Sequence, residues 1–290
     1  MKTATTIPEQ IAKLEERGMT IENKVKASEI LLDVGYYRLG FYWFPFEKNY
    51  PNKKNRDHTF IEGASFKKAV DLYYLDCGLR DILAPFLYRI EVNMRTFLIY
   101  TVSNNYKQRP TWFADNRVVG HKFLIKLQDI YDEIRTNEAI SHHHQKYPND
   151  KYAPAWKTLE YMSFGDIITL IENLKEKDLQ KKIALHYGIR NLDTFYSYMK
   201  TIKVARNLCA HNHNMYDLRL QKSIKAGPLD TKMKNEMHHN LCGVLLVVFY
   251  LLNKISENRE HELKCRLKTL LDNPEYKGLE SIVSFINTIL

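Results

Sequence analysis

The stretch FKKAVDLYYLDCGLRDILAPFLYRIEVNMRTFLIYT, residues 66–101, decides the fold class because its apolar residues recur with the period of an α-helix. That period is interrupted at Pro85, so the sequence predicts one long kinked helix or two helices in series. Glu91 and Arg95 stand four residues apart on its flank, which is the spacing of a surface ion pair along a helix. Orientation of an active-site group is the alternative role for this pair.

The segments on both sides of this stretch are also helical in pattern. Residues 7–34 predict a small helical hairpin that turns at Gly18. Apolar residues recur with a helical period in four later segments, which are 121–140, 154–174, 192–209 and 241–252. Ser163 precedes an apolar run, so the second of these segments is expected to hold two helices that meet near Phe164 and Gly165.

Three segments break the helical pattern. Residues 35–46, GYYRLGFYWFPF, hold seven aromatic residues, which predicts a core plug or a packing surface between domains, with stacking of nucleic-acid bases as the alternative. Residues 47–59 are polar and basic and predict a surface loop. Residues 141–150 contain three consecutive histidines, which cannot all point at one metal ion, so a solvated loop is expected there.

The composition favours a mostly helical protein. The 290 residues include only 11 glycines and 9 prolines, which argues against a turn-rich β-sandwich and against a glycine-rich nucleotide-binding sheet. Hydrophobic residues make up 44% of the chain, which is enough for a core and excludes global disorder. We expect a helical cap at 1–59, a helical core at 60–260 and C-terminal helices at 261–290 that pack on the core.

Charge and cysteine usage bear on the partners and the compartment. The 43 basic residues exceed the 34 acidic ones, and the resulting net charge of +9 attracts polyanions without identifying which one. The four cysteines are far apart and lack a paired spacing, which favours a reduced, cytoplasmic compartment. The N-terminus lacks the apolar core of a signal peptide, and the longest apolar run, 241–252, is too short to cross a membrane.

Residues 206–216, RNLCAHNHNMY, form the one cluster with catalytic chemistry. On a helical wheel Arg206 falls about 20° from Phe195, inside an apolar stripe. The guanidinium therefore needs a partner, which is a buried carboxylate, a symmetry-related helix or a phosphate. His211 lies about 140° further round an ideal helix, so the helix must bend or end there, as the polar residues that follow favour.

An arginine and a histidine suffice for metal-free RNA cleavage, because the 2′-hydroxyl of RNA provides the nucleophile. His211 can act as general acid or base, and Arg206 can hold the scissile phosphate and stabilise its transition state. Asn207 can bind a phosphate oxygen or fix the histidine. An ion pair at a helix end explains the same spacing equally well. No Walker A, dinucleotide-binding, HExxH, EF-hand or serine-elbow pattern occurs, so no metal or other cofactor is expected.

The string RNxxAH, residues 206–211, resembles the R-x4-H signature of the HEPN superfamily of helical ribonucleases and nucleotide-binding domains. Other segments resemble the Abi-like (abortive infection, AbiD/AbiF) branch of that superfamily, in family order: GYYRLGFYWFPF at 35–46, DCGLRDIL with IEVNMRT within 76–96, and PAWKTLEYMSFG at 154–165. Tyr198 stands where relatives often have Trp, and Val204 with Ala205 replaces a bulkier pair. Neither departure touches the proposed chemistry.

This resemblance implies an all-α, HEPN-type helical bundle that acts as a phage-defence or toxin-like endoribonuclease, with a noncoding RNA as controlling partner. It assigns the catalytic roles to Arg206 and His211, with Asn207 as the usual polar member. Glu91 matches an acidic position on an earlier helix that lies near the site in many relatives. Arg95 and His213 are expected to support these residues.

Further expectations concern binding and assembly. The basic connection at 219–234 offers phosphate contacts for RNA, from Arg219, Lys222, Lys225, Lys232 and Lys234. An arginine inside an apolar stripe also fits a two-fold interface, so we expect a homodimer with Tyr198 and Ile202 beside Arg206 at that interface. Two alternatives to an enzyme stay open. One is a non-catalytic RNA-binding module in complex with a noncoding RNA, and the other is a protein-interaction subunit that uses the aromatic segment.

Overall fold

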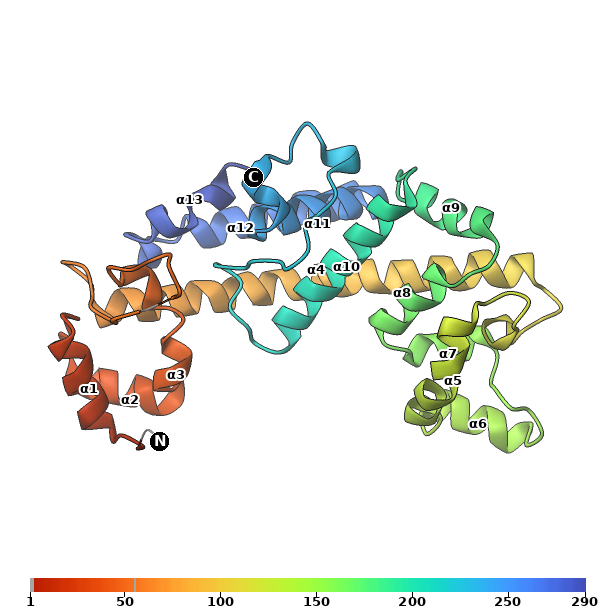
Figure 1. Ribbon diagram of the computed structural model, residues 1–290, viewed down its shortest axis with the longest axis horizontal. Coiled ribbons are helices and arrows are strands. Elements are labelled where there is room, and N and C mark those ends of the chain that lie inside the picture. The colour runs from red at the N-terminus through yellow and green to blue at the C-terminus, as the bar shows by residue number, and fades with distance from the viewer. Residues whose placement is uncertain (1–2, 55) are drawn as a thin grey trace. The chain divides into compact units, whose positions relative to one another are not determined.

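The computed structural model describes residues 3–54 and 56–290, and within them it contains thirteen α-helices, five short 3-10 helices and no β-strand (Figure 1). The α-helices are α1 (Ile7–Glu16), α2 (Lys24–Asp33), α3 (Tyr36–Leu39), α4 (Phe66–Asn105), α5 (His121–Ile134), α6 (Glu138–Lys146), α7 (Ala155–Tyr161), α8 (Phe164–Glu172), α9 (Lys177–His186), α10 (Leu192–Ala210), α11 (Leu241–Ile255), α12 (Glu257–Leu271) and α13 (Glu280–Asn287). The 3-10 helices are η1 (Phe44–Phe46), η2 (Trp112–Ala114), η3 (Gly227–Leu229), η4 (Asn235–His238) and η5 (Pro274–Tyr276). The predicted all-α fold class is confirmed.

The chain forms two compact units, each assembled from separate pieces of sequence. Unit 1 consists of residues 1–82, 212–217 and 264–290, of which residues 1, 2 and 55 lie outside the description. Unit 2 consists of residues 83–211 and 218–263. The division into 1–59, 60–260 and 261–290 stays a prediction, because grouping by contacts does not show which segments fold independently.

Of the two alternatives predicted for residues 66–101, the structure contains the single helix, because α4 runs without interruption over 40 residues. Pro85 lies inside it and cannot donate a hydrogen bond to the carbonyl of Asp81. Both residues are exposed, so this carbonyl lies on the solvent side of the helix, where a missing hydrogen bond costs least. The helix therefore continues through the proline.

The core of unit 1 is built by the helical hairpin and the aromatic segment. Helices α1 and α2 pack together and are joined through Gly18, which has a positive φ of 95°, as the hairpin prediction requires. In the aromatic segment Tyr42, Trp43, Phe44 and Phe46 are buried. The segment thus serves mainly as a core plug. The predicted surface loop at 47–59 is described except at residue 55.

Unit 2 is organised around α10, which packs against α8, α9 and α11 (Figure 1). The predicted boundary at Ser163 is confirmed, because its side chain caps α8 by accepting a hydrogen bond from the Asp166 N–H at 3.2 Å. Helix α11 is the predicted buried apolar helix. Among the described helices none is long and apolar enough to cross a membrane.

The loop prediction for 141–150 is wrong over its first half, because α6 continues to Lys146. Burial overrides the polar pattern here. His143 is buried and its Nε2 lies 3.1 Å from Asp150 Oδ2, while His144 Nε2 lies 2.7 Å from the hydroxyl of Tyr131. Two of the three histidines are thus tied into packing contacts.

Candidate active site

Helix α10 ends where the candidate catalytic sequence lies. Its last residue is Ala210, and His211 is the C-cap, whose N–H donates to the carbonyl oxygen of Asn207 at 3.0 Å. Asn212 follows with a φ of 54°, a left-handed conformation that asparagine tolerates and that stops a helix. The predicted termination at this point is confirmed, so His211 lies on the last turn and not on a continuing helix.

Arg206 meets a carboxylate of another helix within unit 2. Its Nε lies 3.2 Å from Oε2 of Glu91 on α4, and its Nη1 donates to Oδ1 of Asn207 at 3.1 Å. The Arg206 side chain is 33% exposed, against 10% for that of Glu91. Of the partners that the sequence allowed, the structure contains the carboxylate, and it leaves one third of the guanidinium side chain open to solvent.

The same carboxylate also holds Arg95. Glu91 Oε1 accepts from Arg95 Nη2 at 2.8 Å, and Arg95 Nη1 donates to the backbone carbonyls of Leu159, at 3.0 Å, and of Glu160. Glu91 and Arg95 are both buried, so the expected surface location of this ion pair is wrong. The end of α7 lies over α4 at this point and shields the pair from water, whereas the spacing alone suggested a solvent-exposed pair.

Two guanidinium groups therefore share one carboxylate. The cluster keeps an excess positive charge in a place that is partly shielded from water, where electrostatic interactions are stronger than on an open surface. The contact between Glu91 Oε2 and Arg206 Nε is an ion pair without hydrogen-bond geometry, since neither atom has a hydrogen-bond partner. Arg206 is thus the more loosely held arginine of the two, and it can take an anionic group.

An aromatic ring that the sequence did not single out lies beside this cluster. Tyr88 stands one helical turn before Glu91 on α4, and its ring centroid is 5.6 Å from the guanidinium carbon of Arg206. The ring is 42% exposed. The sequence showed that Tyr88 and Glu91 share a helix face, because they are three residues apart. It did not show that Arg206 of α10 lies beside that face.

The two histidines of the motif are exposed. In the described part of the chain the His211 ring has no hydrogen-bond or ion-pair partner, which leaves both of its nitrogens available to a ligand. His213 belongs to the loop 212–217 of unit 1, and its carbonyl oxygen accepts from Arg80 at 3.2 Å. Four predicted residues, Glu91, Arg95, Arg206 and Asn207, thus come together. His211 keeps its helical hydrogen bond to Asn207, so it lies five residues and about 140° round α10 from Arg206.

The loop that follows His211 is held by a buried carboxylate within unit 1. Asp76 accepts hydrogen bonds from the backbone N–H groups of Met215 and Tyr216, at 2.9 and 2.7 Å, and from the hydroxyl of Tyr42 at 2.8 Å. Arg80 pairs with the same carboxylate. Burial raises the pKa of Asp76, and the Arg80 charge and these donors act in the opposite direction. Sequence reasoning missed this anchor.

The aromatic segment contributes to the same anchor. Arg38 donates to the carbonyl of Asn212 at 3.0 Å, and the Tyr216 hydroxyl donates to the carbonyl of Phe41 at 2.5 Å. Segments 35–46 and 76–80 therefore both fix the loop 212–217. Three motifs that are separate along the sequence, the aromatic segment, the segment that begins at Asp76 and the segment that begins at Arg206, therefore meet at the loop 212–217.

Tyr198 and Ile202 do not form an interface. Both are fully buried by other residues of the chain, and the Tyr198 hydroxyl donates to the carbonyl of Ala226. The expectation that they face a second copy beside Arg206 is wrong, because the apolar stripe of α10 is covered by the chain's own core. The homodimer itself stays a prediction.

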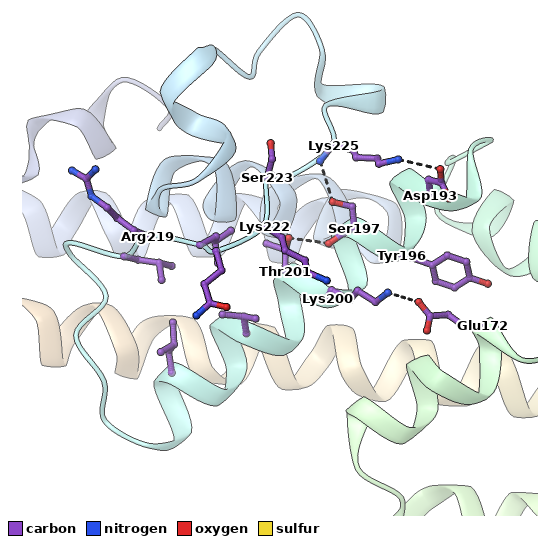
Figure 2. A pocket seen from close by; sticks show the side chains of 15 residues that line it. Glu172, Asp193, Tyr196, Ser197, Lys200, Thr201, Arg219, Lys222, Ser223 and Lys225 are labelled. Carbon is purple, nitrogen blue, oxygen red and sulfur yellow. Dashed lines mark hydrogen bonds and ion pairs between the residues drawn. The ribbon is translucent and has the colours of Figure 1, made fainter. Parts of the chain in front are cut away.

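The basic residues predicted to bind RNA divide into two groups within unit 2. Arg219, Lys222 and Lys225 line one groove beside α10 (Figure 2), whereas Lys232 and Lys234 are exposed outside it. Within residues 3–54 and 56–290, no group of three or more histidine, cysteine or acidic side chains is placed to hold a metal ion.

A comparison with protein families identifies one match. The family model for Abi-like protein covers residues 29–217, which is more than half of the chain. Curated proteins and solved structures give no significant match. The matched region contains all four sequence motifs, and it ends at the last residue of the loop that Asp76 holds.

Proposed function

Because the chain belongs to the Abi-like protein family, we propose that it acts in phage defence as an HEPN-type endoribonuclease that cleaves RNA without a metal ion. RNA brings its own nucleophile, the 2′-hydroxyl, so the protein has only to move protons and to stabilise charge. A regulatory noncoding RNA and a homodimer belong to the same proposal.

Each residue of the cluster has a role in this reaction. His211 accepts the proton of the 2′-hydroxyl or donates one to the leaving 5′-oxygen. Arg206 binds the scissile phosphate and stabilises the negative charge that grows on it in the transition state. Glu91 and Arg95 are positioning residues, since Glu91 contacts Arg206 at 3.2 Å and Arg95 in turn holds Glu91 at 2.8 Å. Asn207 supports the guanidinium from its own helix.

The observation that carries the proposal is the state of Arg206. A guanidinium that served only as a structural ion pair would be matched by its own carboxylate. Here Glu91 is shared with Arg95, and the Arg206 side chain is one-third exposed, five residues before the exposed His211. This arrangement suits a phosphodiester, which supplies the missing negative charge.

A non-catalytic RNA-binding module is the second candidate. It is favoured by the groove beside α10, which gathers basic side chains on a face that carries neither Arg206 nor His211. The two candidates differ in turnover, so incubation of purified protein with mixed RNA, followed by gel electrophoresis, separates them.

The first prediction concerns the products. Cleavage is expected to continue in excess EDTA and to leave a 2′,3′-cyclic phosphate with a 5′-hydroxyl, because the 2′-oxygen is the attacking group. Labelled oligoribonucleotides and mass spectrometry of the fragments measure this. An all-deoxy oligonucleotide of the same sequence is the control and should stay intact. Loss of activity on chelation, or cleavage of the DNA, would contradict the mechanism.

The second prediction concerns Glu91→Gln. Without its carboxylate Arg206 is no longer held in place, so kcat should fall roughly 10–100-fold. RNA binding should be no weaker, because a negative charge has left the cluster. Single-turnover cleavage and a separate binding titration give the two numbers. Asp81→Asn, an exposed carboxylate on the same helix, is the control. A parallel loss of binding and cleavage would argue that Glu91 serves only the fold.

A further inference from the structure

A groove in unit 2 lies between α10 and the segment 218–225 (Figure 2). Its volume is about 720 Å³, within the range of roughly 300–1,000 Å³ that small-molecule sites occupy. Basic side chains at its edge are Lys200, Arg219, Lys222 and Lys225, and we call it the lysine groove. None of the residues of the candidate active site lines it.

The wall formed by segment 218–225 is fixed by backbone hydrogen bonds. The N–H groups of Leu220 and Ile224 donate to the carbonyls of His239 and His238 at 2.7 and 2.8 Å. The N–H of Lys225 donates to Oγ of Ser197 on α10 at 3.0 Å. The chain's own hydrogen bonds therefore order this wall, so that binding does not have to order it.

The charges at the edge are not balanced. Lys225 pairs with Asp193 at 3.0 Å and Lys200 pairs with Glu172, as Figure 2 shows. Lys222 is exposed and has no ion-pair partner among residues 3–54 and 56–290. Three lysines thus face two acidic residues along the lining, and the exposed Lys222 favours an anionic ligand.

The floor of the lysine groove is apolar. It is formed by Val204 and Leu208 of α10 and by Leu218 and Leu220 of the facing segment, and Val204 is 39% exposed. The ring of Tyr196 also lines it, and burial raises the pKa of that phenol, so it stays neutral. An inorganic anion alone would leave this apolar surface uncovered.

We propose that the lysine groove binds a nucleoside phosphate. The base lies on the apolar floor, and Lys222 binds the phosphate, with Lys200 and Lys225 beside it. The ligand is a free nucleotide or the 5′-phosphorylated end of an RNA strand, because both present the same chemistry. Val204 is two residues from Arg206, about 200° round the helix, so this site faces away from the candidate active site.

The test measures binding in the full chain that carries Arg206→Ala, so that its result does not depend on cleavage. AMP, ATP, inorganic phosphate and a 5′-phosphorylated tetraribonucleotide are titrated by calorimetry. We expect the nucleotides to bind and inorganic phosphate to bind at least tenfold more weakly. A tetraribonucleotide that binds more tightly than AMP identifies the strand end as the ligand, and the reverse order identifies the free nucleotide.

Two variants locate the site, each with a matched control on α5. Lys222→Ala should weaken nucleotide binding about tenfold, whereas Lys126→Ala, which removes a similarly exposed lysine, should not. Val204→Glu should abolish binding by adding a negative charge to the floor, whereas Ile125→Glu, at another exposed apolar position, should not. Thermal melts show that each variant is folded.

Three outcomes would overturn the assignment. They are absence of nucleotide binding, equal affinity for inorganic phosphate and AMP, and an equal loss in the two lysine variants, which would mean general attraction to the basic surface. The EDTA and product experiments decide the endoribonuclease proposal separately. Binding in the lysine groove by a protein that cleaves no RNA would leave this inference intact.

Discussion

Arg206→Ala and His211→Ala should each lower RNA cleavage by roughly 10²–10⁴-fold while leaving the fold intact. Arg206 supplies the charge that meets the transition state. Arg95 cannot take its place, because it is buried against Glu91 and two backbone carbonyls. Single-turnover cleavage of a labelled RNA measures the loss, and circular dichroism checks the helix content.

Two comparisons sharpen this result. Arg206→Lys keeps the charge but loses the planar pair of donors, so it should recover only part of the activity. His213→Ala should have a smaller effect on cleavage than His211→Ala. The backbone of His213 is fixed in the loop of unit 1, and we assign the role of general acid or base to His211. Wild-type turnover in His211→Ala would remove that residue from the mechanism.

Asp76→Ala should cost about 3–5 kcal/mol of stability, because it leaves the buried Arg80 without its carboxylate. It also removes the acceptor of the Met215 and Tyr216 N–H groups and of the Tyr42 hydroxyl. Urea unfolding measures the stability, and hydrogen exchange at Met215 and Tyr216 reports on the loop directly.

Asp81→Ala is the matched control for this change. It removes an exposed carboxylate from the same helix and should shift stability by no more than about 0.5 kcal/mol. If Asp76→Ala does not fold, Asp76→Asn retains the shape and part of the hydrogen bonding and should show a smaller loss. Equal stability of the Asp76→Ala and Asp81→Ala proteins would show that the anchor contributes little.

Local patterns were sufficient to predict most helices. The period of apolar residues located α4, α10 and α11, and Ser163 marked the start of α8, because caps and amphipathic faces act within a few residues. The histidine run was misread for the same reason, since its polarity is local whereas the burial of His143 depends on distant packing.

The candidate site was predicted only in part. The position of Arg206 on its helix indicated that it needs a partner, and the family resemblance pointed to Glu91. The spacing of Glu91 and Arg95 indicated their ion pair, but nothing local showed that this pair is buried under the end of α7 or that Tyr88 lies beside Arg206. The burial of Tyr198 and Ile202 was equally hidden, because a helical wheel shows which face is apolar but not what covers it.

The anchored loop limits how far this protein can be shortened. A fragment that starts at Leu83 would carry Glu91, Arg206 and His211, yet it would lack Asp76 and the aromatic segment that hold the six residues after His211. Those six residues would lose five hydrogen bonds, two of them to Asp76 and one each to Arg38, Arg80 and the carbonyl of Phe41. The shortest segment that holds the motif in place is therefore longer than the helices that carry the motif. The family match, at residues 29–217, includes both the aromatic segment and the loop.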